Sequence, residues 1–80
     1  LSKAVTLGQK LVTEGQRDAK TILSAMLALI DAEPLAQIEY VSAVDGNTLA
    51  PIQRLSGTVL VAMAVYIGKT RLIDNFSWEE

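Results

Sequence analysis

Residues 58–67 read TVLVAMAVYI, and residues 68–75 continue as GKTRLIDN. The first run is rich in β-branched residues and lies between two glycines, which favours a buried strand over a helix. It is also shorter than the roughly 20 residues that a helix needs to cross a bilayer. Short loops that contain glycine commonly join hairpin strands. We therefore expect a three-residue turn, Gly68-Lys69-Thr70, leading into a second strand over 71–75.

The strand over 58–67 is apolar on both faces, which a half-exposed antiparallel strand normally is not. One face carries bulky residues and the other carries smaller ones, and the two sets alternate along the chain: Val59, Val61, Met63, Val65 and Ile67 on the first; Thr58, Leu60, Ala62, Ala64 and Tyr66 on the second. We expect the bulky face to meet helices. The small face would let another element, such as one from a second chain, approach closely.

Two helices are expected before the strands. Residues 1–14 have apolar residues at helical spacing, and Gly15 suits a helix end because glycine accepts positive φ. Asp18 can cap a second helix, which should end near Ala32 because Pro34 disfavours helical geometry before it. The expected buried stripe of this second helix is Ile22, Leu23, Met26, Leu29 and Ile30.

Residues 37–44 change to the alternation of a strand, which would place Ile38, Tyr40, Ser42 and Val44 on one face. Asp45-Gly46-Asn47 is typical of a turn, and Pro51 makes 49–55 an irregular or edge segment. The order helix, helix, strand, strand, strand predicts an α+β fold. Two helices would pack on a small, mainly antiparallel three-stranded sheet, as a single small domain over 1–80.

Composition excludes several classes of function. Seven basic and nine acidic residues give a formal net charge of −2 without a basic cluster, which argues against nucleic-acid binding. The chain has no Cys and no His, so disulfides, thiolate sites, common zinc sites and a Ser-His-Asp triad are excluded. No signal-peptide pattern opens the chain, so we expect a cytoplasmic protein with no membrane partner. A start at Leu rather than Met suggests that sequence precedes it.

The carboxylates are the remaining acid–base candidates, and each has a simpler explanation. Asp31 and Glu33 flank a helix end, and Asp45 belongs to a turn. Asp74 has apolar neighbours on its own face, so we expect a structural ion pair with Lys69 or Arg71 rather than catalysis. These residues provide no catalytic, cofactor-binding or metal-binding assignment.

Two short strings match only part of a known binding motif. Gly68-Lys69-Thr70 lacks the earlier glycine of a phosphate-binding loop and leads into a strand, and Asp45-Gly46-Asn47 lacks the later ligands of a calcium loop. We expect Met26 and Met63 to fill the core. Phe76 and Trp78 should fold back onto the sheet, with docking to a partner as the alternative.

Several strings together resemble the C-terminal domain of the bacterial pantothenate synthetase family. They are AEPLAQIEYV at 32–41, Val44-Asp45, Thr48-Leu49 and GKTRLIDN at 68–75, preceded by EGQRDA at 14–19. The resemblance implies an ATP-dependent ligase. Such enzymes adenylate pantoate with release of pyrophosphate, and β-alanine then attacks the acyl adenylate to give pantothenate and AMP.

The resemblance also implies how the parts of such an enzyme divide the work. A Rossmann-like N-terminal domain with a His-x-Gly-His signature holds pantoate and most of the ATP, and a Ser-Ser-Arg-Asn loop reaches the phosphates. Two helices over a three-stranded sheet form a C-terminal lid. This chain has neither signature, and its tail at 76–80 differs from the family's aliphatic end.

We therefore expect a C-terminal lid domain that is inactive alone and binds no cofactor itself, with ATP and Mg belonging to the full enzyme. Its expected partners are the N-terminal domain of the same enzyme and, for the isolated domain, further copies of itself. The alternative is a non-catalytic, self-assembling or partner-binding α+β module.

Overall fold

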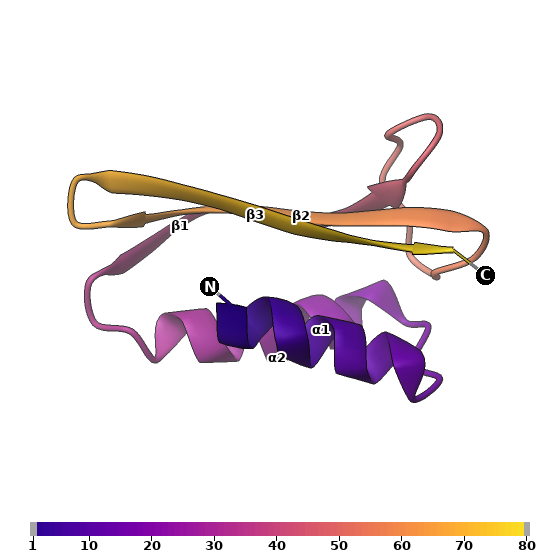
Figure 1. Ribbon diagram of the computed structural model, residues 1–80, viewed down its shortest axis with the longest axis horizontal. Coiled ribbons are helices and arrows are strands. Elements are labelled where there is room, and N and C mark those ends of the chain that lie inside the picture. Colours follow the sequence, from indigo (N-terminus) through magenta and orange to yellow (C-terminus); the bar gives the residue numbers. More distant parts are fainter. Residues whose placement is uncertain (1, 80) are drawn as a thin grey trace.

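A computed structural model describes residues 2–79 and consists of two layers (Figure 1). The elements are α1 (Ser2–Thr13), α2 (Ala19–Asp31), β1 (Ala36–Asp45), β2 (Thr58–Ile67) and β3 (Thr70–Glu79). The strands form one antiparallel sheet in the order β1-β2-β3. Both helices lie on the same face of this sheet, α1 along β3 and α2 along β1. The predicted α+β architecture is confirmed.

Local sequence signals explain where the helices begin and end. Gly15 has φ of 105°, and Ala32 is the C-cap of α2, both as expected. The Asp18 carboxylate accepts hydrogen bonds from the backbone N–H and the hydroxyl of Thr21, at 3.0 and 2.6 Å. It therefore caps α2 by satisfying a donor that the first helical turn leaves free. Leu1 lies outside the described residues.

The hairpin between β2 and β3 has a shorter loop and a longer second strand than the sequence suggested. Ile67 pairs with Thr70, so the loop has two residues, Gly68 and Lys69, rather than three. The φ of 60° at Gly68 suits a type II′ turn, whose twist matches that of the strands. β3 continues to Glu79, well beyond the predicted end at 75, because the alternation of apolar and polar residues persists through the tail.

An irregularity in β1 changes which residues share a face. The register with β2 shifts between Ile38 and Tyr40, where Glu39 is an extra residue. Such a bulge reverses the side on which the following residues lie. Ile38 pairs with Val65 on the helix side, whereas Tyr40 pairs with Ala64 on the opposite side. The expectation that these two residues share a face is therefore wrong.

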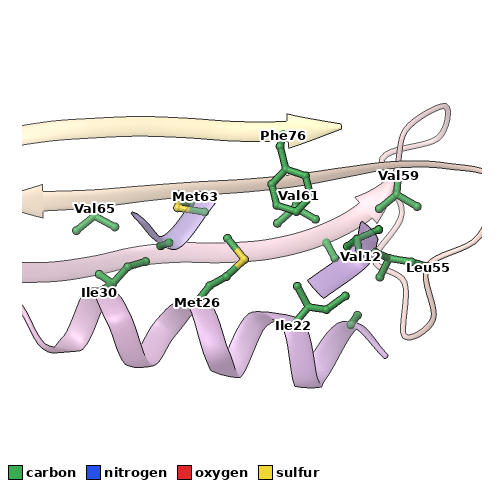
Figure 2. Close-up of a cluster of buried hydrophobic side chains, with 13 residues drawn as sticks. Val12, Ile22, Met26, Ile30, Leu55, Val59, Val61, Met63, Val65 and Phe76 are labelled. Carbon is green, nitrogen blue, oxygen red and sulfur yellow. The ribbon is translucent and has the colours of Figure 1, made fainter. Parts of the chain in front are cut away.

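The core fills the space between the sheet and the helices (Figure 2). Its largest fully buried side chains come from α1, α2, β2 and the loop before β2: Val12, Ile22, Met26, Leu55, Val59, Val61, Met63 and Val65. Leu29 was expected in this core but is 42% exposed. The buried positions of α2 are spaced by three or four residues, and Leu29 lies to the side of that stripe.

The connection over 46–57 is irregular, as Pro51 predicted, but it is well anchored. Leu55 is 1% exposed, and its N–H donates to the carbonyl of Arg17 at 2.8 Å. The N–H of Ala19 donates to the carbonyl of Gln53 at 2.9 Å. These two bonds join the turn between the helices to the long loop, so one end of the helical layer is fixed to the sheet.

Gly8 allows α1 to approach the sheet closely, which generates a prediction. A Cβ at this position would lie 2.6 Å from the Met26 sulfur and 2.9 Å from the Phe76 ring. Gly8→Leu should therefore lower the free energy of unfolding by about 1–3 kcal/mol through overpacking, although leucine favours helices. Urea unfolding measures the loss. Gln9→Leu, on the exposed side of α1, is the matched control and should change little; equal losses in both variants would contradict this packing.

The cap of α2 generates a pH prediction. Hydrogen bonds from Thr21 hold the pKa of Asp18 below its usual value. Because the folded-state pKa is the lower one, the cap stabilises the fold above about pH 4 and loses its effect as the pH falls through the folded-state pKa. Asp18→Asn keeps the acceptor without the charge. Thermal unfolding should show a gap between wild type and variant near pH 7 that narrows toward pH 2; a gap independent of pH would refute the argument.

Candidate functional site

The candidate acid and base residues do not form a cluster. Asp31 and Glu33 are exposed around the end of α2, as the sequence suggested. Asp45 accepts hydrogen bonds from the N–H groups of Asn47 and Thr48 at 2.8 and 2.9 Å, and these bonds lower its pKa. Its role as a turn residue is confirmed. Within residues 2–79, no three acidic, His or Cys side chains gather in a way that could hold a metal ion.

Asp74 lies half-buried in β3, on the face that points to the helices. Its carboxylate accepts a hydrogen bond from the N–H of the next residue, Asn75, at 2.8 Å. The expected ion pair with Lys69 or Arg71 is absent among the described residues. Asp74 and Arg71 are three residues apart in a strand, so their side chains point to opposite faces.

Arg71 instead pairs with Glu39, from β1 at the far side of the sheet. The guanidinium Nε lies 2.8 Å from the Glu39 carboxylate, and this hydrogen bond raises the pKa of Arg71. Both side chains are exposed, so the pair adds little to stability. Sequence reasoning missed this contact because 32 residues separate its members. Only the register across β2 could have revealed it.

Phe76 and Trp78 belong to β3 itself rather than to a tail that folds back. Phe76 is 4% exposed and packs into the core. The Arg17 guanidinium carbon lies 5.3 Å from the centre of the Trp78 ring, a cation–π distance. The indole N–H of Trp78 is buried without a hydrogen-bond partner among the described residues. Both rings therefore serve the core and its edge, and Met26 and Met63 are core residues as predicted.

The sheet face opposite the helices carries no layer of secondary structure among the described residues (Figure 1). We call this surface the open face. In rows across β1, β2 and β3 it presents Gln37–Tyr66–Arg71, Tyr40–Ala64–Ile73, Ser42–Ala62–Asn75 and Val44–Leu60–Ser77. The predicted division of β2 into a helix-facing side and an uncovered side is confirmed. Ile73 is 58% exposed at the open face, and Tyr40 and Tyr66 are 39% and 36% exposed.

The hollows found among the described residues lie beside the helices. One, of about 480 Å³, is lined by Ser2, Lys3, Ala4, Leu29, Ile30, Glu33, Ala36 and Ile67. Another, of about 510 Å³, lies between the start of α2 and the segment 52–53. Ser2 lines the first hollow and Ser24 the second, but within the described part of the chain no hydrogen bond joins either hydroxyl to the acidic or basic side chains beside it. Among residues 2–79, no helix is long and apolar enough to cross a membrane.

Comparison with known proteins identifies the family of this chain, which the geometry alone does not. The model of the family described as pantoate-beta-alanine ligase matches residues 1–77. The pantothenate synthetase of Ruminiclostridium cellulolyticum is 49% identical over 78 residues, and that of Clostridium botulinum strain Loch Maree is 44% identical over 79 residues. These matches cover 98% and 99% of this chain but only 28% of each relative.

A solved structure of pantothenate synthetase from Thermus thermophilus shares the fold. It superimposes with a TM-score of 0.82 over 92% of this chain and 26% of that chain, at 23% sequence identity. A second structure of the same enzyme gives a TM-score of 0.85 at 24% identity. The chain corresponds to the C-terminal part of its relatives. Since the family model covers nearly all of the chain, this chain belongs to the pantoate–β-alanine ligase family.

Proposed function

We propose that this chain is the C-terminal lid of an ATP-dependent ligase that condenses pantoate with β-alanine through an acyl adenylate. The observation that carries the proposal is the family match over residues 1–77 together with 49% identity to a pantothenate synthetase. The relatives do not favour the alternative of a non-catalytic, self-assembling module. ATP and Mg would bind to the full enzyme, which would work in the cytoplasm.

The proposed contribution of this domain is closure rather than chemistry. None of its described residues is assigned a catalytic role, because its carboxylates are scattered over turns, helix ends and strands. A closed lid excludes water, which would otherwise hydrolyse a reactive acyl adenylate before the amine attacks it. A two-layer arrangement with a core shared by both layers suits such a part. Its principal partner would be the N-terminal domain of the same enzyme.

A chimeric enzyme tests this proposal. The 78 matching residues of the Ruminiclostridium cellulolyticum enzyme would be replaced by this chain, and pantothenate formation from pantoate, β-alanine and ATP with Mg would be measured. We expect the chimera to ligate within about tenfold of the parent, because the substrate-binding part is unchanged and the lid has the same fold.

Two controls complete the experiment. The relative truncated before the matching segment, and this chain alone, should each form pantothenate at least about 100-fold more slowly than the chimera, because each lacks one part of the closed site. A chimera that folds, judged by a cooperative thermal transition, yet makes no pantothenate would contradict the proposal. Ligation by this chain alone would contradict its assignment as a lid without catalytic residues.

A further inference from the structure

The open face has an apolar centre that the domain itself does not cover. The row Tyr40–Ala64–Ile73 crosses all three strands, and Ile73 is 58% exposed at its end. Ala64 is fully buried although no helix lies above it, since its larger neighbours shield the small side chain. Leu60 and Tyr66 extend the apolar surface along β2.

This composition is unusual for a sheet face that only meets water. An antiparallel strand with one solvated face alternates apolar and polar residues, yet the outer face of β2 is apolar from Leu60 to Tyr66. Polar groups lie around this centre: the Arg71–Glu39 pair at one end, Ser77 toward the other, and Ser42 and Asn75 on the two edge strands. An apolar centre with tyrosines and a polar rim is the usual anatomy of a protein–protein contact.

The small size of the apolar centre argues against a stable homodimer. The open face is only three strands wide, and its apolar centre is formed by a few side chains. Standard protein–protein interfaces bury about 800 Å² on each partner, and a centre of so few side chains provides less. A contact of this size suits surfaces that one polypeptide holds together, because linkage raises their effective concentration.

The length of the relatives indicates which polypeptide could cover the open face. This chain spans 28% of their length, so most of such an enzyme lies outside the two layers described above. The hollow of about 480 Å³ beside α1 and α2 is a weaker docking surface. Its lining includes the charged Lys3 and Glu33 together with the exposed Leu29. Burying unpaired charges would be costly, whereas the row at the centre of the open face has no charged side chain.

We propose that the open face is the surface by which this domain docks onto the remainder of the ligase polypeptide, against a mainly apolar surface of that chain. The inference rests on the proposed function, since it takes the rest of the enzyme as the occupant. Tyr40, Ala64 and Ile73 form the centre of the contact, and the Arg71–Glu39 pair marks its polar edge.

The absence of cysteine from this chain permits a direct test. Single variants Ile73→Cys at the open face, Leu29→Cys in the hollow beside the helices and Gln9→Cys on the outer side of α1 would be made in the isolated chain and in the chimera. Any cysteine of the relative would be replaced first. Modification by a thiol reagent would be timed by mass spectrometry. We expect Ile73→Cys to react at least about tenfold more slowly in the chimera than in the isolated chain, and Gln9→Cys to react equally in both, because only a buried thiol is shielded from the reagent.

Each other outcome has a defined meaning. Equal reactivity of Ile73→Cys in both proteins, or protection of Leu29→Cys alone, would overturn the proposal. Protection of Ile73→Cys in the isolated chain that grows with protein concentration would indicate a homodimer and also overturn it. Protection in a chimera that is folded but inactive would support the docking face while the proposed ligase function failed. An active chimera in which Ile73→Cys is not protected would support the proposed ligase function and overturn the docking face.

Discussion

The strand β2 is apolar on both faces, and the two helices can cover only one of them. Its bulky residues, among them Val61 and Met63, are completely enclosed by the helical layer. Its small residues Ala62 and Ala64 lie at the open face, between larger neighbours. The same strand therefore provides the core of the domain and an uncovered apolar surface. The fold and the docking proposal both follow from this one constraint.

Close contact between the layers depends on small residues and on anchored loops. Gly8 brings α1 against Met26 and the Phe76 ring, so that the first helix, the second helix and the last strand meet at one point. At the other end, backbone bonds from Leu55 and Ala19 fix the long loop to the turn between the helices. A chain of 80 residues buries a limited fraction of its surface, so such contacts account for much of its stability.

Sequence reasoning predicted the features that local chemistry determines. The cap at Asp18, the end of α2 near Ala32 and the two faces of β2 follow from periodicity and capping preferences. It failed where distant segments meet. The bulge at Glu39 changes the face of the residues after it, and its partner Arg71 is 32 residues away. Membership of the ligase family was predicted from shared strings of sequence, not from an arrangement of catalytic side chains.

The central claim, that the helices support the sheet from one side only, is tested most directly by matched threonine substitutions in urea unfolding. Threonine keeps the strand preference, so the comparison isolates burial. Val61→Thr places a hydroxyl in the core and should lower the free energy of unfolding by about 1–3 kcal/mol. Ile73→Thr, at the open face, should change it by less than about 0.5 kcal/mol. Equal losses at the two positions, or a larger loss at Ile73, would contradict the account.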